Sequence, residues 1–283
     1  MNQISEIQST LAAQGLPAEL IRKWQHLVTL LQSLGSAVVA YSGGVDSTFL
    51  ATVAHQVLGD QMCAVFLQSE VVTEDQTALA DQWANLGGFK AVKLFHDVLN
   101  DERFVSNPVN RCYVCKLAIL GRIQQYAHEN GYQHVIEGQN ADDLLDYRPG
   151  KAAVTETGTK SPLLEAGLTK AEIRTLARAL DLPVWNQPSS PCLATRIPYG
   201  QKITSADLKR VYQAEKHLHS LGFHEVRVRS HQNMARIEVE PDQRQQALDY
   251  ADEILVYFKA IGFMQVALDL QGYRRGSLNE GAV

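Results

Sequence analysis

A short glycine-rich segment near residue 45 has the residue types that bind phosphate. It runs through Ser42, Gly43, Gly44, Val45, Asp46 and Ser47. Glycines allow a tight turn and a close approach of the backbone to a ligand, and hydroxyls and helix N-terminal N–H groups donate to an anion. The lysine of a Walker loop and the third glycine of a dinucleotide fingerprint are both missing. The segment therefore predicts an unusual phosphate loop, with a plain glycine turn as the alternative.

Three of the four cysteines suggest metal or sulfur chemistry. Cys112 and Cys115 form a Cys-x-x-Cys pair, and Cys192 lies in a proline-rich stretch, whereas Cys63 sits in an apolar run typical of a core strand. A structural zinc site needs a fourth ligand, for which neither a second cysteine pair nor a close histidine pair is present. A redox pair at a helix N-terminus is a second possibility. The third is a [4Fe–4S] cluster on Cys112, Cys115 and Cys192, with one iron open to carry sulfide.

The hydrophobic pattern predicts how these residues are held. Strands are expected at 37–41, 62–67, 91–95 and 134–137, and helices at 16–34, 45–58, 73–86 and 114–130. Strands alternating with helices are typical of βαβ units around a parallel sheet, so the expected fold class is α/β. The glycine-rich segment then lies between a strand and a helix, and the cysteine pair lies at the start of a helix.

The second half of the chain predicts a smaller domain. Residues 146–160 are polar and indicate a loop, and Thr169 and Glu172 have the capping-box spacing at the start of a helix. Three prolines between residues 185 and 200 mark a boundary, giving expected domains of residues 1–197 and 198–283. The latter should be α+β, with helices at 205–221 and 242–260 and strands at 225–230, 235–239 and 263–268.

The composition is that of an ordinary globular protein. The 283 residues include 26 Lys+Arg against 31 Asp+Glu, for a net charge of −5, and 45% are hydrophobic. Mild acidity argues against a nucleic-acid partner. No apolar stretch is long enough to span a membrane, and the polar first ten residues do not resemble a signal peptide, so we expect a cytoplasmic protein with no membrane partner.

The SGGVDS segment resembles the pyrophosphate loop of the ATP pyrophosphatase (PP-loop) superfamily, whose fold is the parallel-sheet adenine nucleotide alpha hydrolase type. The resemblance implies that a substrate oxygen attacks the α-phosphate of ATP and that the loop holds the departing pyrophosphate. It places Asp46 near Mg²⁺, the Ser42 and Ser47 hydroxyls on pyrophosphate, and Gln68 and Ser69 toward the adenosine.

Further motifs resemble the LarE-type sulfur transferases. They are EGQNADDLLDYRPG at 137–150, which includes Gly138 and Asn140, SPL at 161–163, TKAEIR at 169–174, PSSPCLATRIPYG at 188–200, and the paired segments 227–229 and 235–238. The resemblance covers residues 37–239. It implies ATP-dependent conversion of the carboxylates of pyridinium-3,5-biscarboxylic acid mononucleotide to thiocarboxylates, a step in making the nickel-pincer nucleotide cofactor of lactate racemase.

The cysteines decide how sulfur would arrive. Members with only the loop cysteine give up its sulfur and keep dehydroalanine. This chain has Cys192 at that position and adds Cys112 and Cys115, so it resembles the three-cysteine branch, in which a [4Fe–4S] cluster delivers sulfide from a donor system. Sacrificial donation from Cys192 and a tRNA thiolase with the same loop and cluster remain alternatives. Family members are oligomers, so a homo-oligomer is expected.

Three arginines suit such a substrate. A nucleotide phosphate and two carboxylates call for forked guanidinium donors. Arg196 follows the loop cysteine, and Arg227 and Arg229 are spaced by two, which puts them on one face of a strand. The alternative is that these two arginines only solvate a strand face, and that Arg236 and Glu238 form an exposed ion pair.

Overall fold

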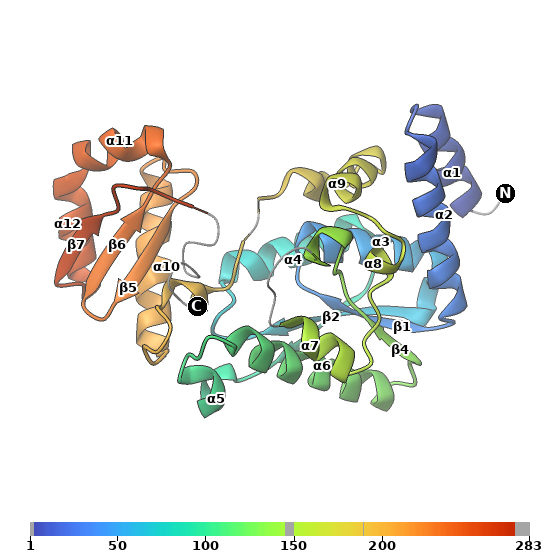
Figure 1. Cartoon of the computed structure of the whole chain (residues 1–283), viewed down its shortest axis with the longest axis horizontal. Coiled ribbons are helices and arrows are strands. Elements are labelled where there is room, and N and C mark those ends of the chain that lie inside the picture. Colours follow the sequence, from blue (N-terminus) through green and yellow to red (C-terminus); the bar gives the residue numbers. More distant parts are fainter. Residues whose placement is uncertain (1–2, 145–149, 189, 275–283) are drawn as a thin grey trace. The chain divides into compact units, whose positions relative to one another are not determined.

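The computed structural model describes residues 3–144, 150–188 and 190–274 (Figure 1). Residue contacts divide the chain into two compact units. The N-terminal unit comprises Met1–Gln68, Glu74–His96 and Cys112–Ser190, and the C-terminal unit comprises Ser69–Thr73, Asp97–Arg111 and Pro191–Val283. The chain thus passes between the units after residues 68, 73, 96, 111 and 190, whereas the sequence analysis expects a single boundary at 197.

A four-stranded parallel sheet forms the centre of the N-terminal unit, in the order β3-β2-β1-β4. Val39 of β1 lies opposite Ala64 of β2 and Ile136 of β4. The two inner strands are apolar and almost wholly buried, as expected for a parallel sheet covered on both faces. This confirms the predicted α/β class. The strands are β1 (Ala37–Tyr41), β2 (Met62–Gln68), β3 (Ala91–Phe95) and β4 (His134–Ile136).

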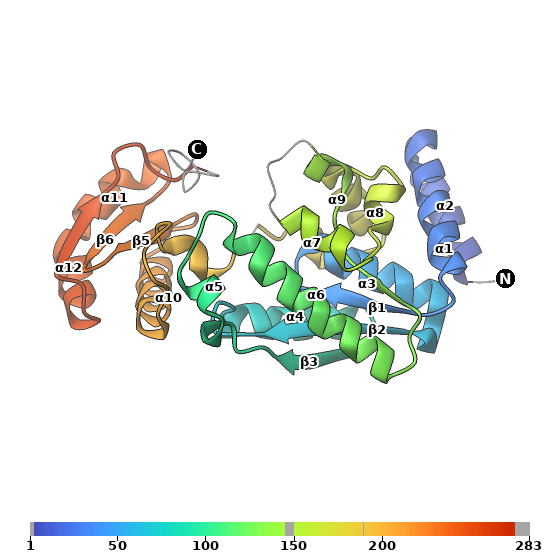
Figure 2. The ribbon, with the colours of Figure 1, turned by 60° about the horizontal axis from the view of Figure 1, so that its bottom comes forward.

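Helices cover both faces of this sheet (Figures 1 and 2). On one face, Ile123 and Ala127 of α6 join Val38, Val65 and Val135 of the strands in one buried cluster. On the other face lie α3 and α4. The helices of this part of the chain are α1 (Gln3–Ala13), α2 (Ala18–Ser33), α3 (Val45–Leu58), α4 (Glu74–Leu86), α6 (Arg111–Glu129), α7 (Gly150–Glu156), α8 (Pro162–Glu165) and α9 (Lys170–Ala179).

Two of these helices differ from the expectation. Helix α7 lies where a loop was predicted for 146–160, because Ala153 and Val154 are buried and hold the segment against the core. Helix α1 was not anticipated, although Leu11 is fully buried and anchors it. Residues 145–149 of the 137–150 motif, and Ser189 of the cysteine loop, lie outside the described residues.

The C-terminal unit is built on a smaller, mixed sheet in the order β5-β6-β7, in which β5 pairs antiparallel and β7 parallel to β6. Its core includes Val211, Val228, Phe258 and Phe263. The predicted helix 242–260 divides at Tyr250 into two helices. The elements are α5 (Glu102–Val105), α10 (Ser205–Ser220), β5 (Arg227–His231), β6 (Met234–Glu238), α11 (Arg244–Asp249), α12 (Ala251–Ala260) and β7 (Gln265–Leu268).

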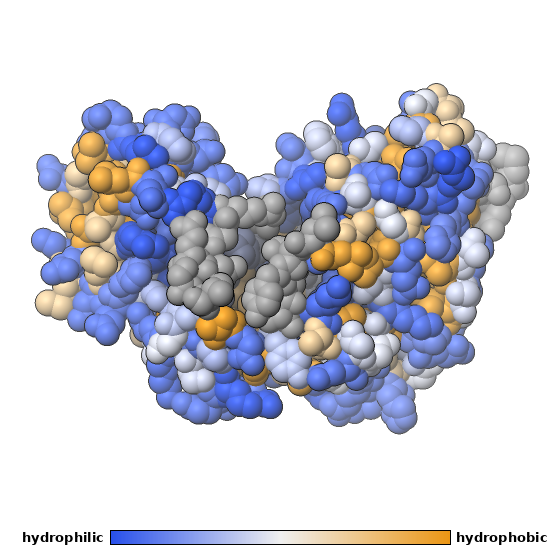
Figure 3. Space-filling view, viewed as in Figure 1, coloured by the Kyte–Doolittle hydropathy of each residue, from blue (hydrophilic) through white to orange (hydrophobic). Residues whose placement is uncertain are grey.

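The surface of the C-terminal unit carries exposed apolar side chains over α11 and α12, among them Leu248 and Val256 (Figure 3). None of the helices in the described part of the chain has both the length and the apolar character that a membrane crossing requires.

Candidate functional site

The glycine-rich segment forms the turn between β1 and α3. Gly43 has φ +73°, and a Cβ there would come within 2.8 Å of the Ala80 Cβ, so a larger residue cannot take its place without a shift of α4. Gly44 is extended and precedes the first residue of α3. The hydroxyl oxygens of Ser42 and Ser47 lie 3.0 Å apart. Two hydroxyls therefore meet at the N-terminus of a 14-residue helix, an arrangement suited to binding an anion.

A lysine distant in the sequence reaches this loop. Lys170 Nζ lies 2.6 Å from Asp46 Oδ2, and both side chains are partly exposed. Lys170 is the first residue of α9, and the predicted capping box between Thr169 and Glu172 fixes that end of the helix. Its backbone N–H also donates to Asp142 Oδ2 at 2.9 Å. The sequence analysis assigned Lys170 no role, because local spacing does not relate residues 124 positions apart.

The chain after β4 packs directly on the glycine-rich loop. A Cβ at Gly138 would lie 3.1 Å from the Ser47 backbone nitrogen, so glycine permits this approach. Asn140 is buried, and its Oδ1 accepts from the Asp142 N–H at 3.0 Å while its own N–H donates to Asp143 Oδ2. Gly138 and Asn140 therefore shape the segment beside the start of α3.

The cysteine pair lies on the first turn of α6, as predicted. Cys112 is exposed and Cys115 is half-buried. The next residue, Lys116, forms an ion pair with the buried Glu137 at 3.0 Å. A Cβ at Gly150 would lie 3.0 Å from Lys116 Cδ, so α7 packs closely against this turn. The cysteine pair is thus tied to the segment that packs on the phosphate loop.

Cys192 belongs to the C-terminal unit and is half-buried. Its carbonyl oxygen accepts from the Thr195 hydroxyl at 2.8 Å and from Arg196 Nη1 at 3.3 Å. The Leu193 N–H donates to the Val71 carbonyl at 2.9 Å. Within the described residues, no three His, Cys, Asp or Glu side chains are grouped as ligands of one metal ion.

The two residues expected near adenosine fall in different units. Gln68 ends β2, and its carbonyl accepts from the His96 N–H at 2.9 Å. Ser69 begins the short segment that belongs to the C-terminal unit. Both are half-buried at the carboxyl end of an inner strand, the edge at which open α/β sheets bind ligands.

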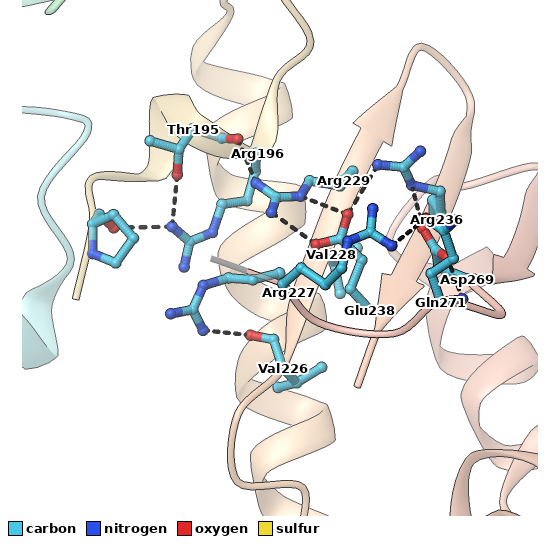
Figure 4. Close-up of polar contacts among 12 residues, drawn as sticks. Thr195, Arg196, Val226, Arg227, Val228, Arg229, Arg236, Glu238, Asp269 and Gln271 are labelled. Atoms are coloured by element: carbon cyan, nitrogen blue, oxygen red, sulfur yellow. Dashed lines mark hydrogen bonds and ion pairs between the residues drawn. The ribbon is translucent and has the colours of Figure 1, made fainter. Parts of the chain in front are cut away.

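Arg196 lies in a fully paired environment. Its Nε and Nη2 donate to both carboxylate oxygens of Glu215 at 2.8 Å, and its Nη1 donates to the Pro191 carbonyl at 2.9 Å (Figure 4). Burial opposes the charge of Arg196, but the Glu215 carboxylate outweighs it and raises the arginine pKa. Arg196 thus shapes the cysteine loop from within the unit.

Arg229 and Glu238 form a second buried pair. Arg229 donates to both Glu238 carboxylate oxygens, at 3.0 and 2.7 Å, and its Nη1 donates to the Thr195 carbonyl at 2.7 Å (Figure 4). Arg236 contacts the same carboxylate at 2.9 Å. Glu238 is fully buried, so the alternative of an exposed ion pair is wrong for this residue.

Arg227 is buried but only weakly neutralised. Its Nη1 donates to the Val226 carbonyl at 2.7 Å, its nearest carboxylate is that of Glu225 at 3.7 Å, and its guanidinium lies over the Tyr273 ring. Burial lowers its pKa, and the nearby charge of Arg196 lowers it further. Since both Arg227 and Arg229 are buried, they do not merely solvate a strand face.

The buried carboxylate leads to a stability prediction. Glu238→Gln should lower the free energy of unfolding by about 3–5 kcal/mol, because the substitution leaves Arg229 buried without its counter-charge. Chemical denaturation measures this. Arg236→Gln is the matched control, since that arginine is 36% exposed and should contribute about 1 kcal/mol or less. Equal, small losses for both variants would contradict the assignment.

Comparison with known proteins gives the chain its relatives. A search of family models finds no match. An uncharacterized protein of Synechocystis sp. is 42% identical over 91% of this chain and 97% of its own length. Pyridinium-3,5-bisthiocarboxylic acid mononucleotide synthase of Lactiplantibacillus plantarum is 37% identical over 93% of this chain and 96% of its own length.

A more distant relative places this family within a superfamily. One polypeptide of the glutamine-hydrolyzing GMP synthase of Archaeoglobus fulgidus is 25% identical over 53% of this chain and 52% of its own length. That match agrees with the parallel sheet and with the glycine-rich turn at the start of α3. On the near full-length similarity to the Lactiplantibacillus synthase, this chain belongs to the LarE-type family of pyridinium-3,5-bisthiocarboxylic acid mononucleotide synthases, within the PP-loop superfamily.

Proposed function

We propose that this enzyme uses ATP to insert sulfur into the carboxylates of pyridinium-3,5-biscarboxylic acid mononucleotide. A carboxylate oxygen attacks the α-phosphorus of ATP, the bond to pyrophosphate breaks, and an acyl adenylate forms. Sulfide then attacks the acyl carbon, and AMP leaves with the original carboxylate oxygen. Each thiocarboxylate therefore consumes one ATP and one sulfide.

One observation carries this proposal. Inside the N-terminal unit, the cysteine pair is tied to the phosphate loop through the Lys116–Glu137 ion pair and the approach of Gly138 to Ser47. A bare amide-forming synthetase would have no use for cysteines at this place. The product named for the Lactiplantibacillus relative is a bisthiocarboxylic acid, which needs both activation and sulfur.

The phosphate loop performs the activation. The hydroxyls of Ser42 and Ser47 and the N-terminus of α3 bind the departing pyrophosphate, while Asp46 holds Mg²⁺. Lys170 supplies the positive charge that a Walker lysine supplies in other loops, because its Nζ already lies at the loop on Asp46. Mg²⁺ on Asp46 releases the ammonium toward the phosphates.

Nucleotide and substrate occupy the surrounding segments. Gln68 and Ser69 contact the adenosine, as the superfamily resemblance implies. Arg227 binds the phosphate of the pyridinium nucleotide, since its guanidinium has only one weak carboxylate contact. Arg229 and Arg196 hold the substrate region in shape through their glutamate partners.

Sulfur delivery falls to Cys112, Cys115 and Cys192. The donor set suits iron, because three thiols are the ligands of a cluster with one open iron, and the pair lies on a single turn of α6. A [4Fe–4S] cluster on these cysteines would supply sulfide repeatedly from an external donor. Cys192, on the loop shaped by Arg196, belongs to this set in either the catalytic or the sacrificial mechanism.

The test is sulfur insertion under anaerobic conditions. Iron-sulfur-reconstituted protein is incubated with the biscarboxylate mononucleotide, Mg-ATP and sulfide, and both substrate and protein are analysed by mass spectrometry. We expect several sulfur atoms inserted per protein, and none when ATP is omitted. The homo-oligomer expected from the family is tested on the same sample by sedimentation.

Two other outcomes carry different meanings. One sulfur per protein, with Cys192 converted to dehydroalanine, would retain the reaction and replace the cluster by sacrificial donation. No insertion in a sample that holds the cluster would overturn the proposed reaction.

A further inference from the structure

Arg111 is a buried cation without an acidic partner among the described residues. Its side chain is 1% exposed. Nη1 donates to Asn107 Oδ1 and, at 3.2 Å, to the Ile197 carbonyl, and the guanidinium lies 4.7 Å from the centre of the Tyr199 ring. Nε and Nη2 are buried without a hydrogen-bond partner. Every contact of this charged group is therefore to a neutral group.

Such an arrangement costs stability. A buried guanidinium loses its hydration, and neutral acceptors return only part of that loss. The other buried arginines of the C-terminal unit do not share the problem, since Arg196 has Glu215 and Arg229 has Glu238. The packing of the unit alone does not account for an arginine at this position.

Asn107 extends the contact into a clamp. It is fully buried with φ +57°, a left-handed conformation that asparagine tolerates better than most residues. Its Nδ2 lies 3.3, 2.7 and 3.0 Å from the carbonyls of Ile197, Pro198 and Gln201. Its own carbonyl accepts from the Gly200 N–H at 2.9 Å.

The clamp joins two segments that bear cysteines. On one side, Ile197 lies five residues after Cys192 in the same loop, whose other end is held by Val71 and Arg196. On the other side, Arg111 is the first residue of α6 and is followed directly by Cys112. All clamp contacts lie within the C-terminal unit, and the peptide bond after Arg111 leads into the N-terminal unit.

We propose that Arg111, together with Asn107, is a positioning residue that fixes Cys112 with respect to the loop of Cys192. This inference rests on the proposed function, in which both cysteines handle sulfur. The guanidinium is retained because it reads the carbonyl at the end of the cysteine loop and the start of α6 at once. An apolar side chain of the same size would fill the space but make neither hydrogen bond.

The test is thiol cross-linking in the apoprotein, with Arg111→Met. A short bifunctional thiol reagent is applied, and peptides joined through Cys112 and Cys192 are quantified by mass spectrometry. We expect the cross-link yield to fall roughly tenfold or more, because small misplacements are costly when two groups must meet. Sulfur insertion should fall with it, while ATP–pyrophosphate exchange stays unchanged and Tm shifts by only a few degrees, since an apolar replacement of a buried ion is close to neutral.

Two further variants keep the result interpretable. Asn107→Gly keeps the left-handed backbone, removes the amide contacts, and should lower the cross-link in the same way. Arg210→Met is the matched control, because Arg210 of α10 also donates to backbone carbonyls and lies over an aromatic ring, that of Phe263, without contacting the cysteine loop. It should lower Tm and leave the cross-link intact.

The outcomes separate the two levels of inference. A wild-type yield in Arg111→Met, or a yield that falls only in step with Tm in all three variants, would overturn the positioning role. No cross-link in the wild-type protein would overturn the grouping of the cysteines in the proposed function, and the clamp's role with it.

Discussion

Cys192→Ser should lower sulfur insertion by roughly 1,000-fold or more and leave ATP–pyrophosphate exchange unchanged. The substitution keeps the backbone carbonyl that holds Thr195 and Arg196, so the loop retains its shape while the sulfur is lost. Cys112→Ser and Cys115→Ser should remove multiple turnover to the same extent, since ligands that act as one unit fail together. Insertion is measured by mass spectrometry and iron content by colorimetry.

The matched control is Cys63→Ser. Cys63 lies in β2 at 1% exposure, and burial raises the pKa of its thiol, so it takes no part in sulfur transfer. This variant should lose stability but retain turnover. If Cys112→Ser kept both its iron and its multiple turnover, the three-cysteine cluster would be wrong.

Lys170→Met should lower substrate-dependent ATP–pyrophosphate exchange by roughly 100- to 1,000-fold. Removing one preorganised donor to a developing charge has an effect of this size. Asp46→Asn should do the same through loss of Mg²⁺. The double variant should be little worse than either single variant, because the two side chains touch and serve one phosphate site. Isotope exchange measures all three.

Lys23→Met is the control for this experiment. Lys23 pairs with Glu172 of the same helix α9 at 2.8 Å, but it lies away from the phosphate loop. Its loss should cost about 1 kcal/mol of stability or less and leave exchange intact. Unchanged exchange in Lys170→Met would make that lysine a simple counter-ion of Asp46.

The sequence predicts much of this architecture because its signals are local. Strand β1, the glycines at 43 and 44 and helix α3 follow one another without a gap, and the observed bounds of α3 match the expected ones. The capping box at Thr169 also depends on residues three positions apart. The polar segment that contains α7 misled the prediction, because its buried side consists only of Gly150, Ala153 and Val154.

The candidate site was less accessible to the same reasoning. Lys170 meets Asp46, and Asn107 meets Pro198, only after the chain has folded, so no spacing rule relates them. Arginines at alternate positions predicted a common strand face for Arg227 and Arg229. Their burial depends on Glu215 and on the cysteine loop, which the strand pattern does not contain.

The interleaving of the two units has a consequence for synthesis and inheritance. Ser69–Thr73 and Asp97–Arg111 leave the ribosome well before residues 191–283, with which Val71 and Val105 form backbone hydrogen bonds. Vectorial folding therefore cannot complete one unit before the other is made. A recombination event that exchanged residues 191–283 as a block would strand both earlier segments with foreign partners. We expect this enzyme to be transmitted as one cassette, and fragments cut at residue 190 to fail as separate proteins.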